Sequence, residues 1–546
     1  MTHEKFEALV NHLSQRAEKN PSSYKNKVIM IVAMGYSYIF ALLLISLIIT
    51  FSVIAYFIME QTINGASAKL AFVFLIFAIF ILRSLWVRIT APPYPVLQKK
   101  DAPKLYEEVE ELTRKLKGPK IHQILFYEES NAFITQIPLL GPFGYYRNYL
   151  VIGLPLMMGH SSEEFHAIIA HEIGHLSKSH GRFGSWIYRI QKTWDILMDT
   201  MNKNSHWGTW LLKGFFNRFV PYLNAHTFVL RRMNEYEADH CSGVVSSSET
   251  TGKTLIRLNL NNIHLDVNFW PKIYKFADEQ SFPPQTIYQQ MEQALLEPIP
   301  AEQGYQWLGQ VLKEKTEIGD THPSLSDRLT SLGVEAKIPD AIECSAFREY
   351  IIHPEDILSL LNDIWRNVMG EEWANRYNYV QDQRAKVAEL NEKEEKGQLT
   401  LDDALNRAII VEEIDGEEKS FPLYESLAAQ YPDQPTAQYY LGRILLKHGR
   451  DEGVPRILKA IEMDDEAALN GYPLIYHYYM DHGKEEEARE YEEQTKQSYE
   501  IFERYEAEKT TVFEWDIFSP HQMPEDFTKQ LKDLLKNYAN IEYAYM

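Results

Sequence analysis

The feature that most limits how this chain can fold is a long apolar segment near its N-terminus. The residues from Val28 to Met59 carry no formal charge, and Leu70–Leu82 is a second wholly apolar run. About 20 consecutive apolar residues are enough for a helix to cross the hydrocarbon core of a bilayer. We therefore expect residues 28–91 to form a hairpin of two transmembrane helices in contact with membrane lipid.

The residues around this hairpin predict its topology. A cleaved signal peptide is the alternative, because Ala66-Ser67-Ala68 resembles a cleavage site, but the first apolar run is far longer than a signal sequence uses. Basic residues flank the hairpin, whereas its connecting loop holds only Lys69. They are Lys5, Arg16, Lys19, Lys25 and Lys27 before it and Arg88, Lys99, Lys100 and Lys104 after it. Since basic residues collect on the cytoplasmic side, we expect an integral protein of the cell membrane with both termini in the cytoplasm.

A short motif further along the chain indicates a metal site. It is His171-Glu172-Ile173-Gly174-His175, and positions i and i+4 share a face of an α-helix, so both imidazoles can reach one cation. Glu172 then lies beside the metal, where its carboxylate can take a proton from a water molecule. A capping box that begins at Ser161 supports the helix. Taken alone, the motif leaves open that two histidines simply pack in a core.

A second motif lies about sixty residues beyond the first. Glu235 and Asp239 are four residues apart in a stretch that reads as a helix. Catalytic zinc sites use three protein ligands, and His, His and Glu is one established set. Glu235 can therefore be the third ligand, while Asp239 can hold the other nitrogen of a ligating imidazole. Glu237 is the rival ligand, although it points away from the face that Glu235 and Asp239 share, and a solvated acidic helix face is the alternative interpretation.

The two motifs, HExxH and ExxxD, resemble those of the membrane zinc metallopeptidases of the gluzincin type, which include the HtpX-type and CAAX prenyl proteases. The resemblance covers about residues 100–335 of this chain. It includes Asn131-Ala132-Phe133, which in relatives belongs to an edge strand that pairs with substrate. It also includes Thr321-His322-Pro323-Ser324, followed by Arg328.

This resemblance implies a role for each of these residues. One zinc ion per chain is expected, with His171, His175 and Glu235 as its ligands and Glu172 as the catalytic base. Residues 131–133 are expected to bind substrate.

The later motif is expected to assist catalysis. His322 is the implied donor to the oxyanion that develops on the substrate carbonyl, with Arg328 in support and Asp239 beside a zinc ligand. Two alternatives stay open for His322, a removable plug on the metal and a plain turn residue before Pro323.

Charge and cysteine content restrict the function further. The net charge is −21, and most of it lies in residues 381–546, which hold 37 acidic and 19 basic residues. An acidic surface repels nucleic acid, so we expect no nucleic-acid partner. Cys241 and Cys344 give no disulfide framework, which fits a reducing compartment.

The acidic tail contains a repeat. Residues 448–452 (HGRDE) recur as residues 482–486 (HGKEE) after 34 residues, and Gly416 lies 33 residues before Gly449. A helix–turn–helix period of 34 residues is typical of tetratricopeptide repeats, whose concave face binds protein partners. Unrelated helical hairpins are the alternative.

These features predict a mainly α-helical chain with a small β-sheet. Strands are expected at Ile121–Tyr127 and Tyr149–Leu154, and a helix is expected over residues 101–117. The expected domains are a cytoplasmic N-terminal segment (1–27), the transmembrane hairpin (28–91), an HExxH zincin domain (92–340), a helical linker (341–399), the repeat domain (400–500) and a C-terminal helical cap (501–546).

The predicted function is a membrane-anchored zinc endopeptidase that acts on protein or peptide substrates, in the quality control or processing of membrane proteins. The alternative from another class is a membrane-tethered repeat scaffold with a non-catalytic zinc site. A structural zinc site is usually four-coordinate and rich in cysteine, unlike this one. A prenyl-protein processing enzyme is the third reading, but that version of the family encloses its site among many membrane spans and this chain shows two.

Overall fold

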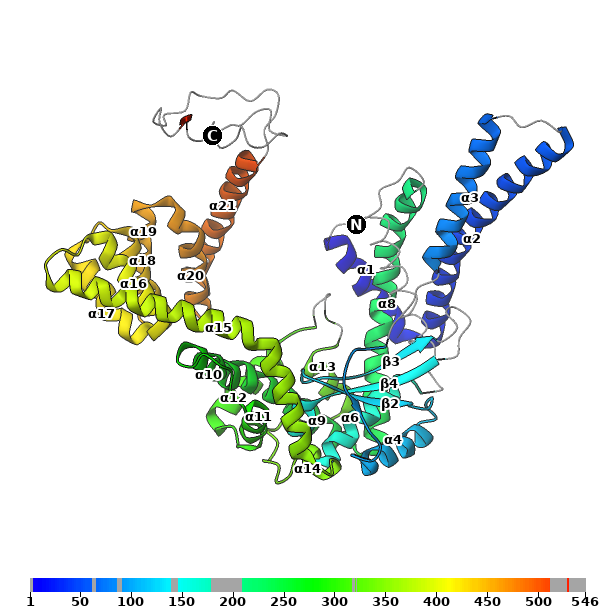
Figure 1. Cartoon of the computed structure of the whole chain (residues 1–546), viewed down its shortest axis with the longest axis horizontal. Coiled ribbons are helices and arrows are strands. Elements are labelled where there is room, and N and C mark those ends of the chain that lie inside the picture. The colour runs from blue at the N-terminus through cyan, green and yellow to red at the C-terminus, as the bar shows by residue number, and fades with distance from the viewer. Residues whose placement is uncertain are drawn as a thin grey trace. The chain divides into compact units, whose positions relative to one another are not determined.

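The computed structural model describes residues 3–60, 65–85, 91–138, 146–177, 209–316, 320, 322–510 and 528–529 (Figure 1). The chain divides into two compact units, Met1–Asn375 and Arg376–Met546. Among the described residues the structure is mainly helical, with one four-stranded sheet. The coarse fold class expected from the sequence is therefore confirmed.

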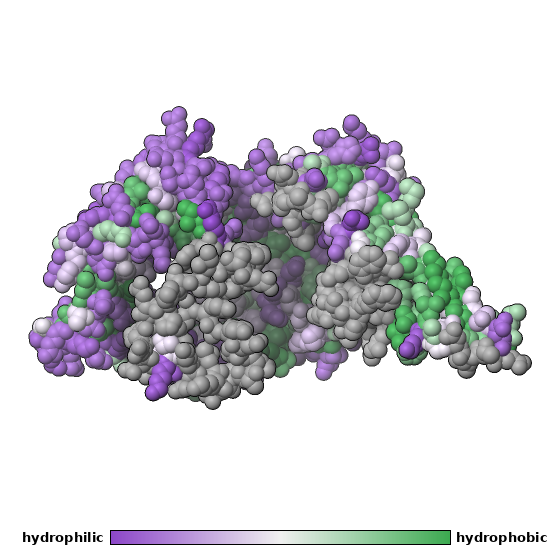
Figure 2. All heavy atoms as spheres, turned by 90° about the horizontal axis from the view of Figure 1, so that it is seen from above, coloured by the Kyte–Doolittle hydropathy of each residue, from purple (hydrophilic) through white to green (hydrophobic). Residues whose placement is uncertain are grey.

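Three helices form the N-terminal part of the first unit. They are α1 (His3–Lys19), α2 (Pro21–Glu60) and α3 (Gly65–Leu85), and α2 and α3 lie side by side (Figure 1). By length and composition α2 can cross a membrane, whereas the apolar part of α3, Gly65–Ile79, is shorter. Large apolar side chains of both helices are exposed and form the green surface on the right of Figure 2. One long apolar N-terminal helix is thus confirmed, while a hairpin that crosses twice stays a prediction.

The sheet has the strand order β1-β2-β4-β3. Its strands are β1 (Val96–Leu97), β2 (Gln123–Tyr127), β3 (Ala132–Pro138) and β4 (Tyr146–Gly153). β2 and β4 are parallel, and β3 runs antiparallel to β4 with Phe133 opposite Val151. β3 is therefore an edge strand among the described residues. The two strands expected at 121–127 and 149–154 correspond to β2 and β4.

The core of the catalytic part lies between the sheet and the helix that carries the HExxH motif, α6 (Ser162–Gly174). Alternate residues of β4 face opposite ways, as the period of two in a strand requires. Leu150 and Ile152 pack against Phe165 and Ile169 of α6, whereas Val151 packs on the other face of the sheet. Apolar burial thus holds α6 against the sheet.

The remaining helices of the first unit surround this core. They are α4 (Pro103–Lys115), α5 (Leu154–Met158), α8 (Thr209–Val245), α9 (Ser248–His264), α10 (Trp270–Lys275), α11 (Ile287–Leu296), α12 (Ala301–Lys313), α13 (Leu325–Leu332), α14 (Ala346–Tyr350) and the start of α15 (Pro354–Glu395). A π-helical turn, η2 (Leu265–Phe269), joins α9 to α10, and a 3₁₀ turn, η3 (Phe276–Asp278), follows α10. The helix expected over residues 101–117 corresponds to α4.

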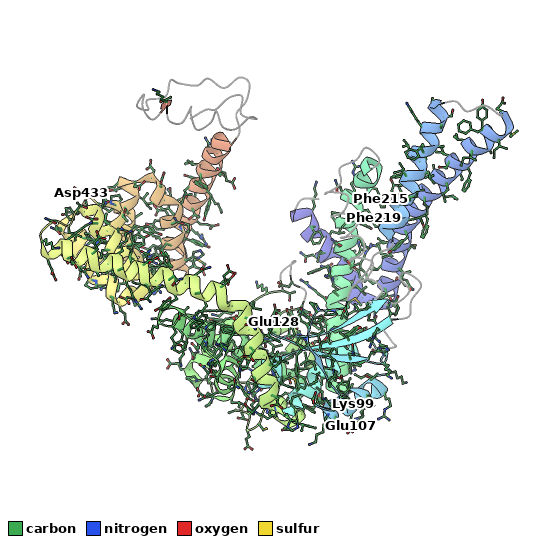
Figure 3. All side chains as sticks on the ribbon, in the orientation of Figure 1. Lys99, Glu107, Glu128, Phe215, Phe219 and Asp433 are labelled. Atoms are coloured by element: carbon green, nitrogen blue, oxygen red, sulfur yellow. The ribbon has the colours of Figure 1, made fainter. Side chains whose placement is uncertain are left out.

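The helix α8 connects the N-terminal helices α1 and α2 to the core. Its N-terminal half packs against α1 and α2 through Phe219, Leu223 and Phe228, and Phe215 stacks on Tyr38 of α2 with ring centroids 3.9 Å apart. Phe215 and Phe219 are labelled in Figure 3. The C-terminal half of α8 packs against α6. One continuous helix therefore carries both sets of contacts.

Within the described part of the second unit, residues 376–510, there are three helical hairpins. They pair α16 (Leu401–Asp415) with α17 (Glu417–Gln430), α18 (Pro435–Lys447) with α19 (Gly453–Met463), and α20 (Ala468–Asp481) with α21 (Glu485–Thr510), and a 3₁₀ turn, η4 (Asp465–Ala467), precedes α20. Gly416, Gly449 and Gly483 have φ values of 94°, 71° and 69°, and each lies at the turn of one hairpin. Positive φ strains any other residue, so the repeated glycines have a structural cause. Their assignment to tetratricopeptide repeats stays a prediction.

Candidate active site

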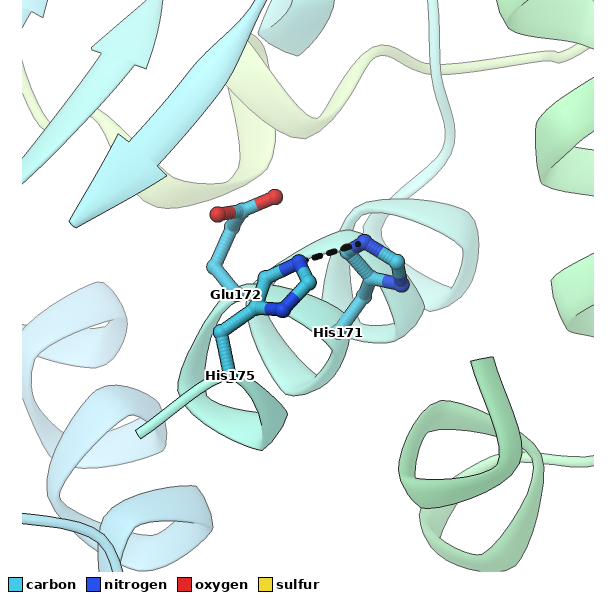
Figure 4. A group of neighbouring side chains, drawn as sticks. All are labelled: His171, Glu172 and His175. Atoms are coloured by element: carbon cyan, nitrogen blue, oxygen red, sulfur yellow. Dashed lines mark hydrogen bonds between the residues drawn. The ribbon is translucent and has the colours of Figure 1, made fainter. Parts of the chain in front are cut away.

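The HExxH motif lies at the end of α6. Ser161 caps this helix, since its side chain accepts from the Glu164 N–H and the Glu164 carboxylate accepts from the Ser161 N–H. The predicted capping box is therefore confirmed. His175 lies one residue past the end of α6 but keeps helical backbone angles, so it stays one turn from His171. The ring Nε2 atoms of the two histidines are 3.1 Å apart, and the Glu172 carboxylate lies beside them (Figure 4).

The second motif reaches this cluster because α8 packs very closely on α6. Gly174 is the contact point, and a Cβ atom there would lie 3.0 Å from Cys241 Cβ and 3.2 Å from Ala238 Cα. The Ser242 hydroxyl also donates to the Ala167 carbonyl across the two helices, at 2.8 Å. The absence of a side chain at Gly174 thus lets α8 present its acidic residues to the histidines.

Glu235 of α8 completes a triangle of possible ligand atoms. Its carboxylate oxygens lie 3.4 Å from His175 Nε2 and 3.6 Å from His171 Nε2. In a tetrahedral site with bonds of about 2.1 Å, ligand atoms are separated by about 3.4 Å. The three side chains therefore fit a zinc ion at their centre. Glu237 turns away and forms an ion pair with Lys25 of α2, at 2.9 Å.

A second group of side chains holds these residues in place. Asp239 is fully buried, with one oxygen 3.0 Å from His171 Nδ1. Arg328 of α13 donates to both oxygens of this carboxylate, at 2.8 and 2.6 Å. Such a partner orients an imidazole and leaves its other nitrogen free for a metal.

His322 lies beside Glu235 and is largely exposed. Its Nδ1 is 2.7 Å from a Glu235 oxygen. An ionised carboxylate only accepts, so His322 Nδ1 is the donor in this contact. His322 Nε2 can then donate to another group only when the ring carries its second proton. The structure thus brings together all seven residues expected from the two motifs and the late segment.

Burial and ion pairing set the charge states around this cluster. Burial raises the pKa of Glu172 to about 7, the range suited to a group that exchanges protons near neutral pH. Burial alone would also raise the pKa of Glu235, but the nearby imidazole of His171 and the hydrogen bond from His322 outweigh it and hold that pKa well below its usual value. Asp239 behaves in the same way, with its pKa lowered by Arg328 and His171.

Only the first two of the three residues expected to bind substrate line the cavity beside the HExxH motif. Asn131 and Ala132 line a cavity of about 740 Å³ that also contains His171 and Glu172. Asn131 lies just before β3, and its carbonyl accepts from the Gly153 N–H at 2.7 Å. Phe133 instead packs against Tyr127.

The other histidines and the cysteines named above lie outside the cluster of possible metal ligands or outside the described residues. His166 contacts Glu108 at 2.7 Å, away from the cluster, and is structural. His180 lies outside the described residues. Cys241 and Cys344 are both free thiols.

Three residues that shape the site could not be recognised from a sequence motif. Gly174 could be noticed only as the small residue of the HExxH helix, whereas Ser242 and Asn262 had no local signal. Asn262 lines the cavity, and its buried Oδ1 has no hydrogen-bond partner among the described residues. These roles depend on which helices meet in space.

Comparison with known families identifies this domain. Residues 99–336, a little under half of the chain, match the model described as peptidase family M48. These residues hold the strands β2, β3 and β4, the helices α6 and α8, and the His-Glu-His group. The domain is therefore that of a family M48 metalloendopeptidase, which binds zinc. The comparison with curated proteins gives no match.

Proposed function

We propose that the chain is a membrane-anchored zinc endopeptidase whose metal is held by His171, His175 and Glu235. The observation that carries this proposal is that the Nε2 atoms of both histidines and the two Glu235 oxygens face one another at 3.1 to 3.6 Å, with the Glu172 carboxylate alongside. Bound zinc supplies Lewis-acid activation of water and of the scissile carbonyl.

The side chains around the metal would each have a separate role in proton transfer, orientation or charge stabilisation. Glu172 accepts a proton from the attacking water and returns it to the leaving amine, and its raised pKa suits both transfers. Asp239 and Arg328 keep the His171 ring oriented. His322 is the donor to the oxyanion through Nε2, with its Nδ1 anchored on Glu235.

The edge strand β3 is the proposed binding site for the substrate backbone. Its outer edge has no partner strand among the described residues. An extended peptide can add to such an edge through main-chain hydrogen bonds. Asn131 and Ala132 at its start then place the peptide over the catalytic cavity.

The membrane helices define the proposed location. We propose that α2 and α3 cross the cell membrane as a hairpin, with the metal site on the cytoplasmic side, and that membrane proteins are the substrates in quality control or processing. A cysteine placed at Glu60, the exposed end of α2, should then react with an impermeant reagent added to intact cells. Labelling of a cysteine in the second unit instead would contradict this topology.

The direct test of catalysis is Glu172→Gln. Glutamine keeps the shape of the side chain but cannot accept the proton, so peptide cleavage should fall at least about a hundredfold. Zinc content should stay at one ion per chain, measured on the purified full-length protein. Glu163→Gln, an exposed glutamate on the same helix, is the matched control and should keep activity. Wild-type turnover in Glu172→Gln would favour the scaffold reading.

A further inference from the structure

The catalytic cavity extends well beyond the metal ligands. An aromatic group, Trp270, Tyr274 and Trp365, forms part of its lining and has no part in the chemistry proposed above. Trp270 stacks on Tyr274 with ring centroids 5.6 Å apart and on Trp365 at 6.3 Å. A wall of stacked rings is well suited to contact a flat or extended side chain of the substrate.

An irregular turn of the backbone determines the position of Trp270 in this aromatic group. The π-helical turn η2 inserts one extra residue between α9 and α10. Since each residue turns an α-helix by about 100°, the insertion rotates every later side chain relative to a regular helix. Asp266 within the turn and Trp270 just after it both line the cavity as a result. Such π-helical turns occur often at functional sites.

Two exposed carboxylates are among the polar groups that line the cavity. Asp266 and Glu128 line it, and neither forms an ion pair with any described residue. Glu128, labelled in Figure 3, lies close enough to Tyr288 for its charge to help burial raise the pKa of that phenol to about 12. Asn262 adds a buried Oδ1 without a donor. The cavity's arginine, Arg328, is already paired with Asp239.

We propose that this part of the cavity is a specificity subsite for a lysine or arginine side chain of the substrate, next to the cleaved bond. The inference rests on the endopeptidase function proposed above. The aliphatic stem of the side chain lies along the aromatic wall, where its cationic end gains from the ring faces. Asp266, Glu128 and Asn262 Oδ1 then accept its N–H donors, and the buried Asn262 Oδ1 gains a partner that it lacks among the described residues.

A series of peptides tests this assignment. Fluorogenic peptides differ only at the two positions beside the cleaved bond, where they carry lysine, norleucine or glutamate. Norleucine has the stem of lysine without its ammonium group, so the ratio of the two kcat/KM values isolates the charge. At one of the two positions the wild-type full-length protein should cleave the lysine peptide about tenfold more efficiently than the norleucine peptide. High salt should reduce this ratio, because it screens charges near the cavity mouth.

Two variants connect the preference to the named residues. The double variant Glu128→Gln/Asp266→Asn should bring the ratio close to one, whereas Glu302→Gln, an exposed glutamate of α12, should keep it. If the double variant does not fold, the ratio of lysine to norleucine cleavage by the wild-type protein, and its dependence on salt, still test the subsite. Equal or better cleavage of the norleucine peptide by wild type would overturn the subsite, while leaving the endopeptidase function intact. Failure to cleave any peptide would overturn the proposed function itself.

Discussion

At the scale of single residues, the site depends on one buried carboxylate. Asp239 is fully buried between His171 and Arg328, with one oxygen 3.0 Å from His171 Nδ1. The Asp239 carboxylate neutralises the charge of Arg328. It also fixes which ring nitrogen of His171 faces His175 and Glu235. The ExxxD spacing therefore combines one ligand and one orienting group on a single helix face.

Asp239→Asn tests this positioning role. An amide keeps the volume but leaves the buried guanidinium of Arg328 without its counter-charge and weakens the hold on His171. We expect zinc affinity to fall by about 10- to 100-fold, measured by competition with a chelator of known affinity. Unchanged affinity, with a normal circular dichroism spectrum, would show that Arg328 and Asp239 serve only the fold.

At the scale of helices and strands, the site is produced by the contact between α6 and α8. Sequence reasoning could predict α6, because its capping box and apolar spacing are local signals. It could also predict that Glu235 and Asp239 share a helix face. The closeness of the two helices at Gly174, the π-helical turn η2 and the partner of Glu237 could not be predicted, because each depends on packing between segments far apart in the chain.

Gly174→Ala tests the helix contact. The added methyl group would lie 3.0 to 3.2 Å from α8 atoms, so the two helices must move apart. Overpacking of this kind costs about 1–3 kcal/mol of unfolding free energy, and the ligand triangle should widen with it. We expect a lower melting temperature and weaker zinc binding. Gly309→Ala in α12, where a methyl group meets nothing within 4 Å, is the control and should not destabilise the protein.

At the scale of the whole molecule, the chain combines a long apolar N-terminal helix, a zinc domain and a separate helical unit. The sequence predicted the three parts from local patterns, namely the uncharged run, the paired motifs and the spacing of Gly416, Gly449 and Gly483. It could not give the boundary at Asn375, which falls inside the continuous helix α15. The hairpins of the second unit are acidic, and we propose that they recruit basic or partly unfolded proteins.

Removal of the second unit's hairpins tests recruitment. A chain that ends at Glu395, the last residue of α15, keeps the whole M48 domain. It should cleave a short peptide at the wild-type rate but cleave protein substrates more slowly, because the local concentration of substrate falls. Zinc content serves as the check that the shortened protein is folded. An equal loss on both kinds of substrate would mean that the hairpins belong to the catalytic fold.

The most direct test of the account is the zinc content of two neighbouring glutamate variants. Glu235→Gln removes the proposed third ligand, whereas Glu237→Gln removes the nearby carboxylate that pairs with Lys25. Metal analysis of the purified full-length proteins should find less than about a tenth of an ion per chain in the first and one ion per chain in the second. Full zinc occupancy in Glu235→Gln, or its loss in Glu237→Gln, would contradict the proposed metal site.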